Sequence, residues 1–310
     1  MIGRRKTIII KMIRQLFREL SKSYYTIGFV DGGMSSVMGK ERLKADFIRW
    51  NVVDSEGSWF ADPFILDVKE DVIEVLVEEM PAAIHKGVIT KLTVDRHTWE
   101  VTGKKVILDL DHHLSFPFIL RQNGEVLICP ENGKSGPLKM YRYDAGRETA
   151  ELCGVLCDDI VWDSAITDIF GERYMFTATK DDHTLDIYRW DAERKRFVAH
   201  QQVASRKNDS RLAGQPFEYG GKRYYPAQVC ESRYGEAVEI KEVECKEDRF
   251  LVRPVKTLHS PHKTLRLGMH TLNEYKGEVV IDVRGFKHRV AGPVLYWIGY
   301  VILKLQGRTY

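Results

Sequence analysis

The chain has 310 residues, of which 44% are hydrophobic and 29% are charged, and its formal net charge at pH 7 is +3. This is the composition of a soluble globular protein, which excludes a wholly disordered chain, and the length fits one large all-β domain as well as two smaller ones. Residues 1–25 carry seven Lys or Arg against one Glu, so the remainder is slightly acidic. A nucleic-acid-binding body is therefore not expected, because it would need a basic surface along the phosphates.

Residues 1–23 predict a basic amphipathic helix. Between residues 8 and 20 the apolar side chains recur at helical spacing, while Lys11, Arg14 and Arg18 fall elsewhere. These cations also interrupt any apolar run that could serve as a secretory signal. The five cysteines lack CxxC spacing, which favours a reducing compartment. We therefore expect a cytoplasmic protein.

One pattern recurs five times at a spacing of about fifty residues, and each copy predicts a strand, a tight hairpin and a second strand. The copies begin at Ala61-Asp62-Pro63-Phe64, Ser115-Phe116-Pro117-Phe118, Asp163-Ser164-Ala165-Ile166, Gly214-Gln215-Pro216-Phe217 and Gly268-Met269-His270-Thr271. Two further strand-like runs separate neighbouring copies, for example residues 87–93 and 100–108. Four antiparallel strands in each of five units predict an all-β fold, a five-bladed β-propeller.

The strand count also predicts how the ring closes. After the fifth copy the chain offers only two strands before Gly285, so the last blade lacks two. The runs 24–30 and 47–53 can supply them. We therefore predict a propeller over residues 24–286, with blade five completed by the N-terminal strands, since this closure leaves no open sheet edge.

Residues 287–310 are expected to form an apolar C-terminal segment outside the propeller, so that short helical extensions flank it on both sides. The run 290–303 is apolar all round but shorter than the roughly 20 residues that span a bilayer. Together with the basic residues 1–23, it is a candidate for contact with a membrane surface, which would make the protein peripheral. The alternative is that the two segments pack on each other or on the propeller.

The first strand of each propeller blade lines the central channel, so the residues that open the five copies should meet at one mouth. The polar and aromatic candidates are Asp62, Phe116, Asp163, Gln215 and His270 from the first strands, and Glu79, Glu131 and Gln228 from the second strands. Such a set suits a saccharide, because sugar hydroxyls need both acceptors and donors and sugar rings stack on aromatic side chains.

Several motifs, in order along residues 24–286, resemble a known family. They are Trp59-Phe60-Ala61-Asp62-Pro63-Phe64, His113-Leu114-Ser115-Phe116-Pro117-Phe118, Pro130-Glu131, Arg211-Leu212-Ala213-Gly214, Pro226-Ala227-Gln228, Arg233-Tyr234-Gly235 and Gly268-Met269-His270-Thr271. Together they resemble the propeller domain found N-terminally in plant glucosamine inositolphosphorylceramide transferases and in stand-alone bacterial proteins. That domain is similar in turn to the family 43 glycoside hydrolases. The resemblance implies a carbohydrate-active protein of cell-surface glycan or glycolipid assembly.

The resemblance also implies residue roles. Family 43 enzymes use an Asp base in blade one, an Asp that orients and tunes in blade three, and a Glu acid in blade four. By motif, Asp62 matches the base and Asp163 the tuning Asp. Gly214 and Gln215 stand where the acid is expected, and the loss of a general acid costs about 10² to 10⁴ in rate. An inverting hydrolase needs both carboxyl groups, so the proton would have to come from a different carboxyl group. The candidate donors are Glu131, Glu79 and Glu239.

Three further assignments leave alternatives open. His270 matches a channel histidine that holds calcium through water in some family 43 enzymes, and otherwise it is a hydrogen-bonded channel histidine; no other cofactor or metal is expected. Arg211 and Arg233 bind a carboxylate or phosphate of the substrate or pair with the channel acids. Asp62 and Asp163 either take part in catalysis or cap turns where their strands begin.

Two functions follow from these observations. The first is an enzyme of the glycoside hydrolase or glycosyl-transfer type, acting on a glycosyl bond through Asp62 and Asp163 with Glu131 or Glu79. The second is a non-catalytic glycan-binding propeller that presents a saccharide or glycolipid to a partner glycosyltransferase. Under either function the expected substrate-binding residues are Phe116, Arg211, Gln215, Gln228, Arg233, Glu239 and His270.

Overall fold

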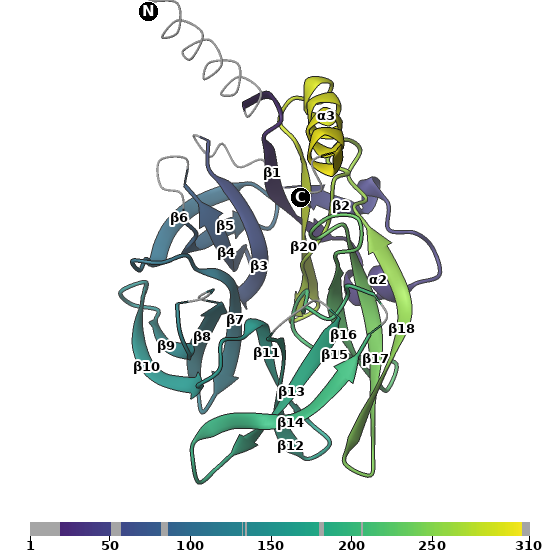
Figure 1. Cartoon of the computed structure of the whole chain (residues 1–310). Helices are drawn as coiled ribbons and strands as arrows, with labels where there is room; N and C mark the ends of the chain where they lie inside the picture. The colour runs from purple at the N-terminus through teal and green to yellow at the C-terminus, as the bar shows by residue number, and fades with distance from the viewer. Residues whose placement is uncertain are drawn as a thin grey trace, which may run out of the picture.

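The computed structural model describes residues 19–50, 57–81, 86–131, 133, 135–179, 183–205 and 207–305. These residues form five four-stranded antiparallel sheets arranged around one axis (Figure 1). The prediction of an all-β five-bladed propeller is therefore confirmed. The predicted helix in residues 1–23 lies almost wholly outside the described residues.

The first four blades follow one another along the chain, each with four consecutive strands. Blade one contains β3 (Trp59–Val68), β4 (Val72–Met80), β5 (Val88–Asp95) and β6 (Val101–Leu108). Blade two contains β7 (Ser115–Gln122), β8 (Glu125–Glu131), β9 (Leu138–Asp144) and β10 (Thr149–Cys157). Blade three contains β11 (Trp162–Ile169), β12 (Glu172–Ala178), β13 (Thr184–Asp191) and β14 (Arg196–Ala204). Blade four contains β15 (Phe217–Tyr219), β16 (Lys222–Val229), β17 (Ala237–Lys246) and β18 (Arg249–His259).

Blade five joins the two ends of the propeller. Its strands stand in the order β19 (Leu272–Tyr275), β20 (Glu278–Phe286), β1 (Ser23–Val30) and β2 (Ile48–Trp50). β1 pairs with β20 from Ser23 opposite Phe286 to Phe29 opposite Val280. A short helix, α2 (Gly33–Met38), and a 3₁₀ turn at Ala45–Phe47 connect β1 to β2. Backbone hydrogen bonds thus close the ring, with β1 and β2 as the strands that the fifth repeat lacks.

The hairpins between the first and second strands of four blades have the turn chemistry that their sequences predict. Both residues of each two-residue connection have positive φ, which is the conformation of a type I′ turn and matches the twist of the flanking strands. The four connections are Asn123-Gly124, Phe170-Gly171, Gly220-Gly221 and Lys276-Gly277. In these four blades the turns hold the first two strands in register, which fixes the relative positions of the strand ends farthest from the turn.

Aromatic side chains pack the blades against one another. Phe64 of blade one meets Phe116 and Phe118 of blade two edge to face, with ring centroids 4.9 and 6.2 Å apart. Phe176 of blade three meets Tyr225 and Phe250 of blade four in the same way, at 5.7 and 5.6 Å. Burial of such rings is the main stabilising contribution between adjacent sheets.

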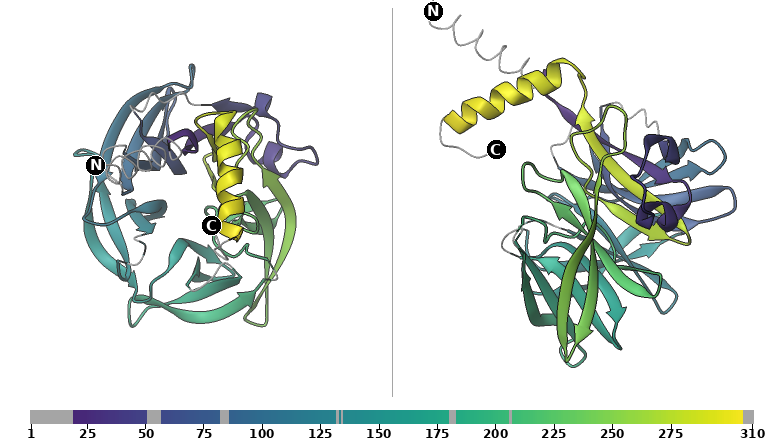
Figure 2. Two further views of the ribbon diagram at one scale, coloured as in Figure 1. Left: turned by 45° about the horizontal axis from the view of Figure 1, so that its top comes forward. Right: turned by 90° about the vertical axis from the view of Figure 1, so that its right-hand side faces the viewer.

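The C-terminal helix α3 (Ala291–Leu305) lies outside the sheets and follows the end of β20 (Figure 2). Its Tyr296 ring contacts Phe286, with centroids 5.4 Å apart. In the described part of the chain, α3 included, no helix is both long and apolar enough to cross a membrane.

Candidate functional site

Three of the five copies carry the same backbone irregularity at the start of the first strand. The register between the first and second strands shifts next to Asp62, Phe116 and Asp163, whose φ angles are 49°, 43° and 47°. A left-handed φ in a residue other than glycine costs about 1 to 3 kcal/mol and persists only where the surroundings fix it. The repeat therefore places a bulged, strained residue at the same point of three blades.

Carboxylates of the preceding blade hold these bulges. The Asp62 amide donates to Asp282 of blade five at 3.1 Å, and the Phe116 amide donates to Asp62 at 3.0 Å. The Asp163 amide donates to Glu131 of blade two at 3.0 Å. A purely local structural role would require Asp62 to cap its own turn. Its carboxylate instead accepts from an amide of the next blade. Each of these acids links neighbouring blades.

Asp62, Asp282 and His270 form a sealed cluster between blades five and one. His270 Nδ1 lies 2.6 Å from Asp282 Oδ2, and Thr271 Oγ1 donates to Asp62 Oδ1 at 2.7 Å. The exposed fractions are 5% for Asp62, 3% for His270 and 0% for Asp282. The Tyr25 ring stacks on His270 at 4.7 Å. His270 is therefore a hydrogen-bonded channel histidine that is almost wholly buried.

The pKa values in this cluster follow from burial and from the ion pair. Burial alone lowers the pKa of His270, but the Asp282 and Asp62 carboxylates outweigh it and raise that pKa. Burial alone would raise the pKa of Asp282, but the contacts of Asp282 with His270 outweigh burial and hold that pKa below its usual range. The pKa of Asp62 is raised by burial, with His270 opposing. Asp282 and His270 thus form a buried ion pair.

A second cluster, from blades two, three and four, is more open. Arg211 Nε lies 2.7 Å from Asp163 Oδ2, and its terminal nitrogen lies 3.4 Å from Glu131 Oε2. Gln228 Nε2 donates to Asp163 at 2.8 Å. The Arg211 side chain is 17% exposed and that of Glu131 is 10% exposed. Of the two roles left open for Arg211, the contacts show pairing with the channel acids.

Aromatic rings flank this open cluster. The Arg211 guanidinium lies 5.5 Å from the Trp162 ring centroid and 5.3 Å from that of Tyr234. Tyr234 is 43% exposed and also meets His270 edge to face at 5.5 Å. The sequence drew attention to the motif that contains Tyr234 but assigned no role to this ring. No local signal could have suggested one, because the arginine that lies against this ring is Arg211 and not the adjacent Arg233.

The channel carboxyl group of blade one is Glu78 and not Glu79. Glu78 stands opposite Ala61 just as Glu131 stands opposite Ser115, so Glu78 and Glu131 are equivalent. Burial, followed by the charges of Asp62 and Glu131, raises the pKa of Glu78 well above its usual value. Glu79 faces the other side of the sheet, where it binds Lys104 Nζ at 2.8 Å and Thr90 Oγ1 at 2.8 Å.

The physical reason for this correction is a second bulge. The register of β3 and β4 shifts between Ile65 and Asp67, so one extra residue lies between the Phe64 pair and the hairpin. If strand pairs are counted from the hairpin turn, Glu79 falls opposite Ala61. If they are counted from the Phe64 pair, Glu78 falls opposite Ala61, as it does in the structure. A slip of one residue moves a side chain to the opposite face of a strand.

Other predicted site residues also lie elsewhere. Phe116 is fully buried against Phe64 and is not an aromatic floor for a ligand. Gln215 is held between blades four and five, where its amide donates to Asn273 Oδ1 at 2.8 Å and its side chain donates to the Glu274 carbonyl. Arg233 reaches the Leu267 carbonyl at 3.4 Å. Phe116 meets the channel acids only through its backbone amide, which donates to Asp62, and the contacts described for Gln215 and Arg233 lie outside the acid clusters.

Glu239 lies outside the channel as well. It stands opposite Ala227 in the β16–β17 pair, so its side chain points away from the face that carries Gln228. Burial and the neighbouring Asp209 carboxylate raise the pKa of Glu239, against the charge of Lys241. Its surroundings are a separate cavity between blades three and four.

The backbone packing around Gly214 explains why the fourth copy has no acid at this position. A Cβ atom on Gly214 would collide with the Leu272 carbonyl oxygen and lie 2.6 Å from Asn273 Oδ1. No side chain fits there without displacing blade five. The departure from the family 43 pattern is therefore a packing requirement of this chain.

Asp62, His270 and Asp282 are also a group of potential metal ligands, with donor atoms within 4.8 Å of one another. Calcium takes six to eight oxygen ligands. Asp282 Oδ1 already accepts the His270 and Thr271 amides, and Oδ2 accepts the Asp62 amide and faces His270 Nδ1. Direct ligation of calcium does not fit this set, and calcium held through water at His270 remains a prediction.

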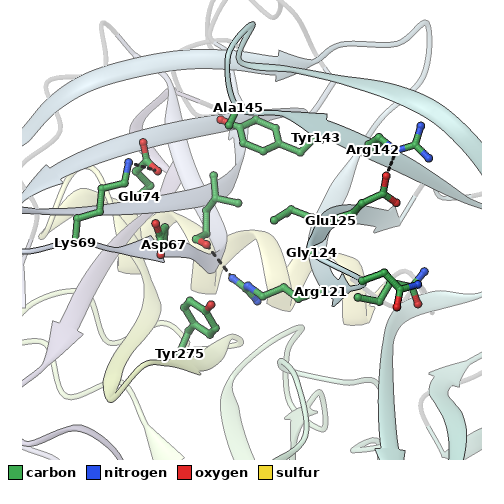
Figure 3. Close-up of a pocket in the computed structure, with 14 residues that line it drawn as sticks. Asp67, Lys69, Glu74, Arg121, Gly124, Glu125, Arg142, Tyr143, Ala145 and Tyr275 are labelled. Carbon is green, nitrogen blue, oxygen red and sulfur yellow. Dashed lines mark hydrogen bonds and ion pairs between the residues drawn. The ribbon is translucent and has the colours of Figure 1, made fainter.

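A groove of about 750 Å³ lies at the opposite end of blades one and two, among the hairpin turns (Figure 3). Arg121 crosses it, stacking 3.6 Å from the Tyr275 ring centroid and donating to the carbonyls of Ile65 and Leu66. It thereby satisfies carbonyls at the β3 bulge. None of the predicted site residues lines this groove, so the channel mouth remains the candidate site.

The fold and the channel together define a five-bladed propeller with a carboxylate-rich channel mouth. A family model described as glucosamine inositolphosphorylceramide transferase 1, N-terminal, matches residues 50–264, which is more than half of the chain. This chain therefore belongs to that family, as its motifs predicted.

The curated relatives are much longer than the matched segment. Glucosamine inositolphosphorylceramide transferase 1 of Oryza sativa subsp. japonica is 27% identical over 199 residues, and that of Arabidopsis thaliana is 26% identical over 202 residues. Both matches cover 60% of this chain and 26% of the relative. The chain thus matches about a quarter of the length of these proteins.

Solved structures share the fold. A β-xylosidase superposes with a TM-score of 0.52 at 12% identity, covering 74% of this chain and 92% of that chain. An exo-β-1,3-galactanase from Phanerochaete chrysosporium superposes with a TM-score of 0.52 at 10% identity, covering 84% and 67%. At such identities the likeness shows the fold alone.

Proposed function

We propose that this chain is a carbohydrate-active protein of glycan or glycolipid assembly, and that its channel mouth binds the glycosyl group of the substrate. The family supports a saccharide ligand, since the relatives are named for a glucosamine inositolphosphorylceramide transferase. The matched segment is a quarter of those relatives, so their named activity does not by itself specify what this part does.

The observation that carries the proposal is the open cluster around Arg211. It offers a donor in Arg211, an acceptor in Glu131 and the exposed ring of Tyr234 within one neighbourhood. Gln228 Oε1 is a further buried acceptor without a hydrogen-bond partner among the described residues. Hydroxyl groups both donate and accept, and the apolar face of a sugar ring suits an aromatic side chain, so a saccharide complements this set.

Two observations favour binding over hydrolysis by the channel aspartates. The Asp62 carboxylate accepts from Phe116 and Thr271 and is 5% exposed, which leaves it poorly placed to activate water. Gly214 also excludes an acid in blade four. We therefore propose a glycan-binding propeller that presents its ligand to a partner glycosyltransferase.

Catalysis is the second candidate, and the state of Glu131 favours it. Burial, then the Asp163 charge, raises the pKa of Glu131 well above its usual value, with Arg211 opposing. A carboxyl group that keeps its proton near neutral pH is what a general acid requires. Under this proposal Glu131 protonates the leaving group in place of the missing blade-four acid.

One experiment separates the two candidates. The full chain is screened for glycan binding on an array, and each bound glycan is then incubated with the purified protein and analysed for products. The same is done with Glu131→Gln and with a control, Glu125→Gln, which changes the same residue type at the far end of β8. Binding without products supports the presenting role, and products that disappear only in Glu131→Gln support catalysis. Failure to bind any glycan would contradict both.

We also propose that α3 contacts a membrane surface. Val294 and Trp297 of α3 are 54% and 64% exposed and lie three positions apart on the helix, and Val290, which directly precedes the helix, is 82% exposed, so the three form one apolar stripe. Lys287 and Arg289 are exposed directly before it. An apolar stripe beside cations suits a surface of anionic lipids.

Vesicle flotation tests this contact. Binding to vesicles with anionic lipid should fall in Val294→Ser/Trp297→Ser and persist in the control Val255→Ser, which changes an exposed valine of β18. Equal flotation of all three proteins would rule out α3 as the contact.

A further inference from the structure

A cavity of about 250 Å³ lies between blades three and four, away from the channel. One part of its wall is apolar, with Leu185, Val203, Tyr225, Val252 and Pro254. The other part carries Lys207, Asp209, Ser210, Glu239 and Lys241. None of the channel carboxylates lines it. The cavity is therefore separate from the candidate site described above.

Four of the five residues in the polar wall are deeply buried, whereas the Lys207 side chain is 51% exposed. Asp209 is 2% exposed, Ser210 1%, Glu239 3% and Lys241 4%. Lys241 Nζ lies 2.8 Å from Asp209 Oδ1 and donates to the Asp209 carbonyl at 2.7 Å. Glu239 has cations only at longer range, with Lys207 Nζ at 3.6 Å and Lys241 Nζ at 3.9 Å. With two acids and two lysines, the formal charges of this wall balance.

Buried polar atoms without partners concentrate in this wall. Six buried side-chain atoms among the described residues make no hydrogen bond, and three of them lie in this wall. One of the three, Asp209 Oδ1, is ion-paired with Lys241 Nζ, so the atoms that remain unpaired are Ser210 Oγ and Glu239 Oε2. An unpaired buried polar group costs about 1 to 3 kcal/mol, and native proteins rarely leave several together. The cavity therefore needs an occupant that supplies hydrogen bonds to Glu239 and to Ser210.

The lining restricts the chemistry of that occupant. Glu239 needs a donor, while Ser210 and Lys207 can donate, so the occupant must both donate and accept, as hydroxyl groups do. Because the formal charges balance, a neutral molecule fits better than an ion. The apolar wall suits C–H groups rather than water alone, since each buried water needs two to four polar partners. A volume below the roughly 300 Å³ at which ordinary ligand pockets begin limits the occupant to a single ring.

We propose that this cavity binds one neutral, pyranose-sized polyol through Ser210 and Glu239, as a saccharide site distinct from the channel mouth. The choice of a sugar among polyols rests on the proposed carbohydrate function, whereas the existence of the site rests on the cavity and its unpaired atoms.

The test is titration calorimetry of the full chain with D-glucose, D-galactose and D-xylose. At least one of them should bind saturably at one site. Glu239→Gln removes a charged acceptor, worth about 1.5 to 3 kcal/mol, and should weaken this binding about tenfold or more. Ser210→Ala should weaken it about two- to tenfold. Glu242→Gln, the same change on the opposite face of β17, should leave it unchanged.

A channel variant, Arg211→Ala, separates this inference from the proposed function. Binding that Glu239→Gln weakens and Arg211→Ala does not would support the cavity site whether or not the channel binds glycans. Binding that only Arg211→Ala weakens would place the sugar in the channel and overturn the inference while the proposed function stands. Absence of binding by all three sugars would also overturn it. Thermal melting verifies the fold of each variant, and the small Ser210→Ala change decides the question if Glu239→Gln does not fold.

Discussion

The two halves of the channel mouth use their carboxylates differently. Between blades five and one, Asp282 is 0% exposed and is saturated by three amides and His270. Between blades two and four, Glu131 and Arg211 keep exposed edges, and Gln228 keeps an unpaired oxygen among the described residues. The sealed half holds the ring closed, and the open half keeps partly exposed polar side chains and an unpaired acceptor that a ligand can meet. Similar residues thus perform structural work on one side and are available for binding on the other.

The largest expected effect concerns the sealed half. Asp282→Asn removes the charge that pairs with His270 and places donors against backbone amides, so we expect a loss of about 3 to 5 kcal/mol in the free energy of unfolding. Urea denaturation at pH 7 measures it. Asp248→Asn, at a residue whose side chain is 61% exposed, is the control and should change little. A loss below about 1 kcal/mol for Asp282→Asn would show that this half does not hold the ring.

A moderate, pH-dependent effect is expected in the open half. The raised pKa of Glu131 means that the folded state binds its proton more tightly than the unfolded state, where the pKa is about 4.3. The stabilisation from this proton is complete below that value and is lost as the pH rises through the folded-state pKa. The unfolding free energy of the natural protein, relative to Glu131→Gln, should therefore fall as the pH rises from 4 to 8. A difference that grows with pH would contradict the assignment.

The smallest effect distinguishes the two faces of β4. Glu79→Gln breaks a pair between Lys104, whose side chain is 45% exposed, and the Glu79 side chain, which is 3% exposed. It should cost about 1 to 3 kcal/mol in the free energy of unfolding while leaving glycan affinity unchanged. Glu78→Gln changes a carboxyl group beside Asp62 and should alter glycan affinity. The comparison uses one array-identified glycan for both variants. Glycan affinity that changes in Glu79→Gln and not in Glu78→Gln would show that Glu79 is the channel residue.

Features of the fold that depend on neighbouring residues in the chain could be predicted from the sequence, and features that depend on distant residues could not. The hairpin glycines and the alternating strands are local, so the five blades, and the use of residues near 24–30 to complete the last one, could be read from the chain. The sequence predicts Glu79 and not Glu78 as the channel carboxyl group of blade one, because the bulge beside Leu66 depends on strand pairing that no local pattern reports. The bond from Asp62 to Asp282 joins residues 220 positions apart and has no local signature. Phe116 was assigned to the channel by its place in the repeat, yet an apolar ring at that point packs on Phe64.

Glycan affinity of Arg211→Ala tests the central claim most directly. If the open half binds the glycosyl group, the glycan that binds the natural protein best should bind this variant at least about tenfold more weakly, because a hydrogen bond to a charged group is worth about 1.5 to 3 kcal/mol. The control Arg173→Ala breaks a pair with Asp168 at the hairpin end of blade three and should bind as the natural protein does. Equal affinity of all three proteins would contradict the claim that the channel mouth is the glycan site.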